Sequence, residues 1–176
     1  MEREEEPIGS ILARRSIRKY TKEPCSKQQI KILLEAAMAA PSAGNRKPWC
    51  FVVVTERESM DKLAEMHEHG KMLLEAPLCI AVCADMARTA QGEARDFWIQ
   101  GCSAATENIL LAATGLRLGA VWLGVHPRRD LKEAVRTILS IPDEVVPFCL
   151  VAVGHPAEVK DPRTQYDEAV VHCERW

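Results

Sequence analysis

The sequence predicts one domain in which helices cover a β-sheet. Its 176 residues are 47% hydrophobic and 27% charged, a balance typical of globular chains that bury one sizeable core. Segments with helical periodicity alternate with short apolar runs typical of strands. No repeat, low-complexity stretch or Gly/Ser linker divides the chain. This order fits either an α/β or an α+β fold, and periodicity alone does not choose between them.

Two helices are expected in the first forty residues. The first is short and covers residues 8–14. The second begins after Ser26, which can cap it, and Gln29 occupies the matching position of a capping box. Pro41 ends this helix because proline cannot continue the hydrogen-bond ladder. Its apolar face is formed by residues at helical spacing: Ile30, Leu33, Leu34, Ala37 and Met38.

Helices and strands alternate through the rest of the chain. Runs rich in strand-forming residues predict strands at 51–55, 78–84, 120–125 and 145–153. Helices are predicted at 58–67 and 96–116, and the second half of the longer one is apolar almost all round, which indicates burial on more than one side. A last helix carries Asp130 and Glu133 as a second capping box. Its apolar face comprises Leu131, Ala134, Val135, Ile138 and Leu139.

Charge and hydropathy exclude several classes of protein. The formal net charge of −2 gives no bulk attraction to nucleic acid or to anionic membranes. Residues 1–7 are acidic and lack the features of a signal peptide. The longest apolar run, around 145–153, is far shorter than the roughly 20 residues that span a bilayer. We therefore expect a soluble cytoplasmic protein with no nucleic-acid and no membrane partner.

The cysteines suggest packing rather than metal binding. Seven are present, without a CxxC pair: Cys25, Cys50, Cys79, Cys83, Cys102, Cys149 and Cys173. Neither a zinc site nor disulfides are expected from this pattern. Cys79 and Cys83 are four residues apart in a predicted strand, so they face the same side and are expected to pack as small hydrophobic residues.

Arginines crowd the segment that follows the first helix. Arg14, Arg15 and Arg18, with the hydroxyl of Ser16, lie within five residues. Guanidinium groups are rigid forks of donors, so such a group can grip a phosphate. A solvated basic turn is the competing interpretation, and for an arbitrary chain it is the favoured one. Contact with nucleic-acid phosphates is a third, although no stacking aromatic residue accompanies the arginines beyond Tyr20.

A stiff loop at residues 41–48 precedes the first strand. Pro41 and a second proline restrict its backbone, and Gly44 permits unusual backbone angles. Ser42 and Asn45 offer neutral donors and acceptors. Such a loop can hold the edge of a flat heteroaromatic ligand, or it can be an ordinary connection.

The remaining motifs exclude familiar nucleotide and metal sites. The glycines of residues 115–124 do not match GxGxxG, and no Walker lysine follows them. They can equally end a helix and allow a strand to approach closely. The histidines form no HExxH motif. His67 and His69, on either side of Glu68 at a helix end, are expected at the surface.

Taken in order, these elements resemble the FMN-dependent nitroreductase family, and the match runs across nearly the whole chain. The matching segments are 14–18, 41–49, 112–119, 121–124 and the Gly-His-Pro element at 154–156. The short length and the ending at 171–176 are similar to the compact branch of that family.

That resemblance implies an α+β fold in which a mixed β-sheet is sandwiched by helices, within an intertwined homodimer. Two FMN molecules would bind at the subunit interface. Residues 1–176 would form a single FMN-binding domain, and residues 155–176 would be a tail exchanged with the partner subunit. This exchange would explain why the last 22 residues contain only one short apolar run.

By position, the resemblance implies FMN contacts from Arg14, Arg15, Ser16, Arg18, Pro41, Ser42, Asn45, Lys71, Leu123, Gly124 and Arg163. The four residues of segment 14–18 would bind the phosphate and the ribityl or pyrimidine side, and Arg163 would complete the phosphate site. Ser42 and Asn45 would reach the flavin from the other subunit, in a loop shaped by Pro41.

Two further contacts concern the flavin ring. Leu123 and Gly124 would present backbone groups near flavin N5. Lys71 resembles the lysine that some members place near N1 and O2.

The implied activity is that of an NAD(P)H oxidoreductase in which FMN performs the chemistry. Hydride would pass from NAD(P)H to flavin N5 and then to a nitroaromatic, quinone or similar small acceptor, with ping-pong kinetics. No catalytic side chain and no metal is required. The alternatives are reductive dehalogenation or flavin fragmentation on the same fold, and a flavin-binding storage or regulatory protein without turnover. A nucleic-acid module is disfavoured by the acidic net charge.

Overall fold

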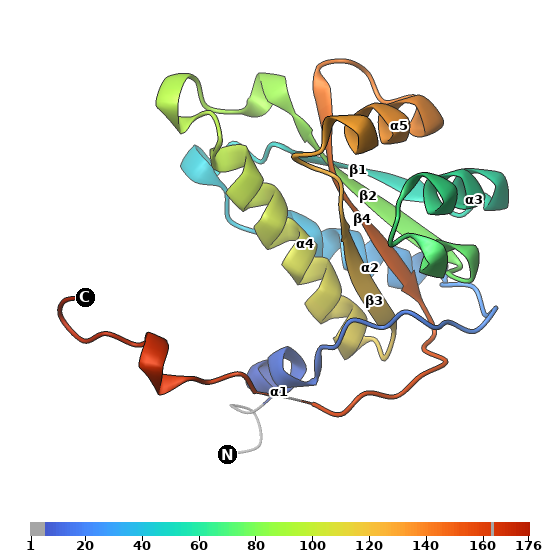
Figure 1. Cartoon of the computed structure of the whole chain (residues 1–176), viewed down its shortest axis with the longest axis horizontal. Coiled ribbons are helices and arrows are strands. Elements are labelled where there is room, and N and C mark those ends of the chain that lie inside the picture. The colour runs from blue at the N-terminus through green and yellow to red at the C-terminus, as the bar shows by residue number, and fades with distance from the viewer. Residues whose placement is uncertain (1–5, 163) are drawn as a thin grey trace.

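A computed structural model describes residues 6–162 and 164–176 of the chain. At its centre is a four-stranded sheet in the order β1-β2-β4-β3 (Figure 1). The strands are β1 (Trp49–Val54), β2 (Leu78–Asp85), β3 (Gly119–Gly124) and β4 (Val145–Gly154). All three strand pairs are antiparallel. The parallel part expected of a mixed sheet is, within the described residues, a single bridge between Ser16 and Ala120.

Helices cover both faces of this sheet, which confirms the predicted α+β fold with a sheet between helices (Figure 1). They are α2 (Lys27–Met38), α3 (Arg57–Met66), α4 (Phe97–Gly115) and α5 (Arg129–Leu139), whereas α1 (Glu6–Ala13) lies against α4. Every predicted helix and strand begins and ends within two residues of its observed bounds where both bounds were predicted. The periodicity of the sequence therefore locates the elements well.

The face covered by α3 and α5 contains the cysteines predicted to pack as hydrophobic residues. Cys79, Ala81 and Cys83 of β2 alternate onto this face and are buried with Leu63 and Val135 from the two helices. Burial removes water from the thiolate form and so raises the pKa of the Cys79 thiol to about 12. Both cysteines are thus part of the core, as predicted.

The opposite face is covered by α2 and α4. Ala105, Ile109 and Ala113 of α4 are fully buried in the core on this face. On another side of α4, the Asn108 Nδ2 atom donates to the carbonyl oxygen of Ala36 in α2 at 2.9 Å. The helix is therefore buried on more than one side, as its composition predicted. Within the described part of the chain, no helix has the length and apolar character needed to cross a membrane.

The two predicted capping boxes have different outcomes. At α2, the Ser26 hydroxyl accepts from the Gln29 N–H at 3.1 Å, and the Gln29 side chain accepts from the Ser26 N–H at 2.7 Å, which confirms the first box. The second prediction was wrong. Helix α5 has Arg128 at its N-cap and no side-chain cap. Asp130 lies inside the first turn, where its carboxylate binds the Arg128 guanidinium at 2.7 Å instead of capping the helix.

The segment after Gly154 leaves the sheet and first runs beside the residues that follow α1. Tyr20 forms an antiparallel bridge with Pro156, and the Ala157 N–H donates to the carbonyl oxygen of Lys19 at 2.9 Å. The tail stays beside this segment as far as Asp161, and its later residues extend away from the body as an arm (Figure 1). Its apolar side chains are uncovered: Val159, Tyr166, Val170, Val171 and Trp176.

Candidate functional site

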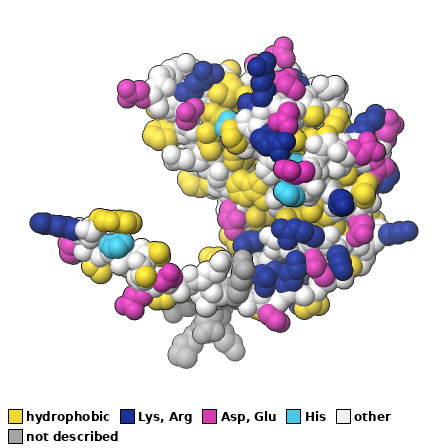
Figure 2. Space-filling model, viewed as in Figure 1, with side chains coloured by type: hydrophobic (Ala, Val, Ile, Leu, Met, Phe, Trp, Pro, Cys, Tyr) yellow, Lys and Arg dark blue, Asp and Glu magenta, His cyan; other side chains and the backbone are white. Residues whose placement is uncertain are grey.

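A cavity of about 580 Å³ opens beside the C-terminal end of β3. It is called the β3 cavity below, and its walls are Arg18, His67, Glu68, His69, Lys71, Met72, Trp122, Leu123 and Gly124. Ligand sites in proteins commonly have this size. Lys and Arg side chains gather on this face of the molecule near histidine and apolar surface (Figure 2). Folding thus brings together four predicted FMN contacts that lie far apart in the sequence: Arg18, Lys71, Leu123 and Gly124.

The edge of β3 supplies polar backbone groups to this cavity. The Val125 N–H donates to the carbonyl oxygen of Phe148 at 3.2 Å, toward β4. Because successive residues of an antiparallel strand direct their backbone groups to opposite sides, those of Gly124 point away from β4. Ala120 has the same parity, and its carbonyl oxygen accepts from the Ile17 N–H on that open side at 3.0 Å. The Gly124 N–H and C=O therefore lie on the free edge of the sheet, beside the cavity.

Space is left at Gly124. A Cβ atom placed on this residue would meet no other atom of the described chain within 4 Å. Packing inside the chain therefore does not require glycine at this position. The missing side chain instead leaves the strand backbone open to a ligand.

A tight turn positions Lys71 on the rim of the cavity. The Gly70 N–H donates to the carbonyl oxygen of His67 at 2.7 Å. A Cβ atom at Gly70 would lie 2.9 Å from the carbonyl oxygens of Ala64 and His67, so only glycine fits. Leu73, two residues after Lys71, is fully buried and anchors the 3-10 turn Lys71–Leu74 that follows.

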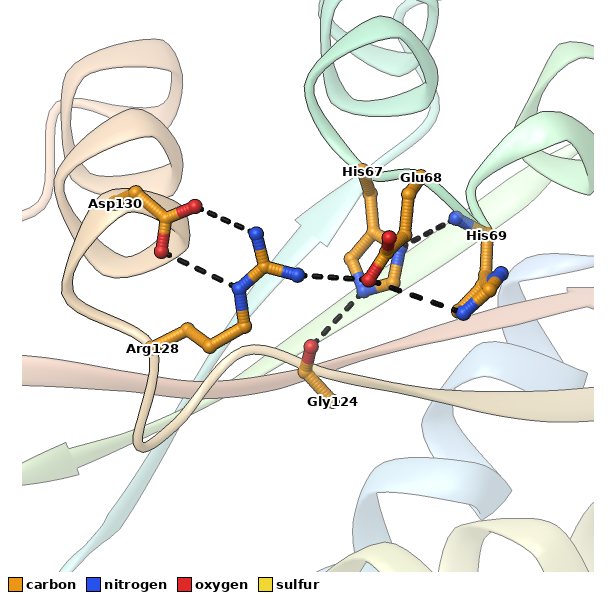
Figure 3. Close-up of polar contacts among 6 residues, drawn as sticks. All are labelled: His67, Glu68, His69, Gly124, Arg128 and Asp130. Carbon is orange, nitrogen blue, oxygen red and sulfur yellow. Dashed lines mark hydrogen bonds and ion pairs between the residues drawn. The ribbon is translucent and has the colours of Figure 1, made fainter.

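His67 was predicted at the surface, and this prediction was wrong. The residue is 5% exposed, and its ring lies between the end of α3 and the end of β3 (Figure 3). Nε2 is 2.9 Å from the Gly124 carbonyl oxygen, and Nδ1 accepts from the His69 N–H at 3.1 Å. The imidazole can be buried because both nitrogens have partners, which a sequence pattern does not reveal. His69 is exposed, as predicted.

A surface ionic cluster lies next to this histidine. The Arg128 guanidinium is 2.7 Å from a carboxylate oxygen of Glu68 and 2.7 Å from one of Asp130 (Figure 3). Hydrogen bonding from Arg128 lowers the pKa of the Asp130 carboxyl. The cluster links the residues after α3 to the start of α5, close to the β3 cavity.

The predicted phosphate-binding arginines have different partners within one chain. Arg14 Nε is 3.3 Å from a carboxylate oxygen of Glu107 in α4. The Arg15 guanidinium donates to the backbone carbonyl oxygen of Asp161 in the tail. Arg18 lines the β3 cavity. The segment after α1 is extended, so neighbouring side chains point in different directions rather than forming one cluster.

The tail also contacts this arginine segment. The Ser16 carbonyl oxygen accepts from Lys160 Nζ at 2.6 Å, and the Arg18 backbone N–H donates to the Glu158 carboxylate at 2.6 Å. This hydrogen bond from Arg18 lowers the pKa of the Glu158 carboxyl. Arg163, the predicted last member of the phosphate site, lies outside the described residues.

The loop at residues 41–48 lies elsewhere. The Ser42 hydroxyl accepts from the Lys47 N–H at 2.9 Å, and Asn45 has a positive φ of 53°. Pro41 and Ser42 line a separate hollow of about 380 Å³, called the α4 cavity, together with Ala43, Phe97, Gln100, Gly101 and Ala104. The two cavities share no lining residue. The loop leads into β1, at the opposite edge of the sheet from β3, so within one chain Ser42 and Gly124 lie at different cavities.

The Nitroreductase family profile matches residues 11–69 and 66–155 of this sequence. The chain therefore belongs to the nitroreductase family, as its motifs predicted.

Known proteins resemble it over nearly its full length. A protein of Methanothermobacter thermautotrophicus, named as a candidate NADH dehydrogenase/NAD(P)H nitroreductase, is 44% identical over 96% of this chain and 87% of its own. The solved FMN-dependent nitroreductase of Clostridium difficile R20291 is 30% identical, with a TM-score of 0.88 over 96% of this chain and 99% of that one. A candidate nitroreductase of Desulfovibrio desulfuricans, solved in complex with FMN, is 32% identical, with a TM-score of 0.79 over 96% and 97%.

Proposed function

We propose that this chain binds FMN at the β3 cavity and transfers hydride from NAD(P)H to nitroaromatic, quinone or similar small acceptors. It is an FMN-dependent NAD(P)H oxidoreductase of the nitroreductase type. One observation carries the assignment of the site. Arg18, Lys71 and the open backbone of Gly124 meet at one cavity in a chain of this family.

The residues at the cavity fit a flat, electron-accepting ring. When bound, FMN supplies the redox chemistry, since its N5 takes and releases hydride. Gly124 gives the ring access to the strand backbone, and Leu123 adds apolar surface beside it. Lys71 and Arg18 hold positive charge at the same cavity, which stabilises negative charge on a reduced ring. No side chain of the site is needed as a nucleophile or a general acid.

The phosphate of FMN would bind beside Arg14, Arg15 and Ser16. In the free chain Arg14 and Arg15 are bound to Glu107 and to the tail. For Arg15, a negatively charged phosphate oxygen is a stronger acceptor than the neutral Asp161 carbonyl, whereas Arg14 would exchange one anionic partner, Glu107, for another. Arg163 stays a proposed member of this group.

A homodimer would complete the site. In this arrangement the Pro41–Ser42 loop and Asn45 come from the partner subunit, and residues 155–176 are exchanged between copies. Two features support it. Strand β1 lies at an edge of the sheet, where another chain can pair. The tail also exposes apolar side chains that a second copy would bury (Figure 2).

The cofactor and the activity can be tested on the purified chain. The expected result is a yellow protein with about one FMN per chain and steady-state oxidation of NADH or NADPH when menadione or a nitroaromatic is supplied. Parallel lines in double-reciprocal plots would support ping-pong kinetics. A colourless protein that cannot be reconstituted with FMN would contradict the proposal, whereas FMN binding without turnover would favour a storage or regulatory role.

A further inference from the structure

We propose that His67 is a positioning residue of the flavin site, which acts by holding the backbone of Gly124. In this proposal, its imidazole donates a hydrogen bond to the Gly124 carbonyl and thereby keeps the N–H of the same residue aimed at the β3 cavity. The inference rests on the proposed FMN site, but it concerns hydrogen bonds that exist in the free chain.

The hydrogen bonds define the tautomer of His67. The His69 backbone N–H can only donate, so Nδ1 of His67 must carry a lone pair to accept it at 3.1 Å. The proton of a neutral imidazole then lies on Nε2. Nε2 is 2.9 Å from the Gly124 carbonyl oxygen, which can only accept. Both contacts are therefore satisfied by one neutral ring with a single orientation.

Two different elements meet through this ring. Nδ1 is bound to the turn that carries Gly70 and Lys71, and Nε2 is bound to the last residue of β3 (Figure 3). Gly124 is the last residue of β3 that pairs with β4, and it has no side chain to restrict its backbone. The Gly124 carbonyl shares a peptide plane with the Val125 N–H, which donates to the Phe148 carbonyl oxygen at 3.2 Å, so a contact to the carbonyl holds this plane from its other side. His67 supplies that contact from a buried site.

The contact between His67 and Gly124 matters for the ligand because of the direction in which the Gly124 backbone groups point from β3. The N–H and C=O of Gly124 point to the same open edge of the sheet. The two groups belong to adjacent peptide planes joined at the Gly124 Cα atom, so holding the C=O by His67 restricts φ and ψ of Gly124 and, through them, the direction of the N–H on the cavity side. The histidine therefore acts through Gly124, and it is not itself required to touch the flavin.

Other contacts hold the two elements near each other without His67. Arg128, which precedes α5, binds Glu68 at 2.7 Å, and Leu63 of α3 and Val135 of α5 are buried in one core cluster. Substituting His67 should thus loosen the Gly124 peptide without separating α3 from α5. This permits a test with folded variants.

The test compares His67→Asn with His67→Gln. An asparagine amide can replace Nδ1 as the acceptor of the His69 N–H, but it is too short to reach Gly124. A glutamine amide can replace Nε2 as the donor to the Gly124 carbonyl, but it leaves the His69 N–H without its acceptor. Each variant thus keeps one of the two hydrogen bonds. The measurements are the FMN dissociation constant, from quenching of FMN fluorescence on titration with apoprotein, and the melting temperature of each apoprotein.

The proposal predicts that His67→Asn weakens FMN binding by roughly 2- to 12-fold, the value of one lost hydrogen bond, and that His67→Gln stays within about twofold of the natural chain. If His67 only stabilised the turn through the His69 N–H, His67→Gln would weaken FMN binding more than His67→Asn. Equal losses in both variants, no loss in either, or a greater loss for His67→Gln would overturn the proposal.

The tautomer can be measured independently of FMN. Imidazole ¹⁵N chemical shifts of the apoprotein should show a protonated Nε2 and an unprotonated Nδ1 for His67. A proton on Nδ1 would overturn the proposal even if both variants failed to fold. If the natural chain binds no FMN while the Nε2–H tautomer is found, the proposed cofactor site fails and the hydrogen bond stands.

Discussion

The β3 cavity and the α4 cavity differ in how firmly their walls are held. Three residues support the wall of the β3 cavity. His67 is buried and has two hydrogen bonds, Gly70 lies in a turn where only glycine fits, and Leu73 is fully buried. The α4 cavity is formed by an exposed loop and by the first turns of α4, where Phe97 remains 45% exposed. The β3 cavity is thus shaped by this chain alone, whereas the α4 cavity presents apolar surface that another chain can cover. This contrast is expected of two halves of a site that is assembled between subunits.

Removing the end of the tail should have the largest effect. A chain that stops after residue 162 keeps the contacts of the tail with residues 15–21 but loses the exposed residues from 164 onward. Because those residues are proposed to bind the partner, we expect a monomer that retains no FMN. Light scattering and the flavin spectrum would measure this. A truncated chain that is still dimeric and yellow would show that the tail does not join the halves.

Arg15→Ala should weaken FMN binding much more than Arg46→Ala. Loss of a charge-assisted contact costs roughly 1.5–3 kcal/mol, which is about 10- to 150-fold in affinity. Arg46 is the control because its guanidinium donates to the Thr89 carbonyl oxygen at 3.4 Å and it is not among the proposed FMN contacts. Titration of both apoproteins with FMN measures the difference. Equal affinities would remove Arg15 from the phosphate site.

Alanine substitution of Gly124, which lines the β3 cavity, and of Gly70, which lies in the turn beside it, should separate FMN binding from stability. Gly124→Ala adds a Cβ atom where the chain leaves room, so we expect an unchanged melting temperature and FMN binding weaker by about tenfold. Gly70→Ala forces a Cβ atom to within 2.9 Å of two carbonyl oxygens and should lower the free energy of unfolding by about 1–3 kcal/mol. Thermal denaturation and FMN titration of both variants test this. Equal losses of stability would contradict the assignment of open space at Gly124.

The smallest expected effect is the reaction of a thiol reagent with the buried cysteines of the core, which lies behind both cavities. Burial raises the pKa of Cys79 and of Cys102 to about 12, so both thiols stay protonated and unreactive at pH 8. Cys173 is exposed to solvent, where a reagent can reach its thiol. In the native protein, a thiol reagent such as dithionitrobenzoate should therefore modify Cys173 first and the two buried cysteines only after unfolding. Early reaction of Cys102 but not Cys79 would show that the core behind the α4 cavity opens on its own.

Local rules predicted the elements but not all of their contacts. Helical spacing and the Ser26–Gln29 pair located α2, because both depend on residues within a few positions of each other. The second capping box failed because Asp130 had a closer partner in Arg128. That competition depends on where the chain enters α5, which the pattern does not specify.

The candidate site also contains residues that the sequence predicted and one whose role it did not predict. Motifs pointed to Lys71, Leu123 and Gly124, and the fold brings these residues together with Arg18. The burial of His67 could not be predicted, because its partner Gly124 is 57 residues away in the sequence. One local signal exists in the sequence. His67 lies three residues before Gly70, and the tight turn that Gly70 permits indicates that the His67 side chain is held in place.

A crystal structure of the FMN-loaded protein would test the central claim most directly. We expect two copies of the chain, with each flavin ring against Leu123 and Gly124 of one copy and near Ser42 of the other. FMN seated entirely within one chain, or bound away from the β3 cavity, would contradict a site shared between subunits.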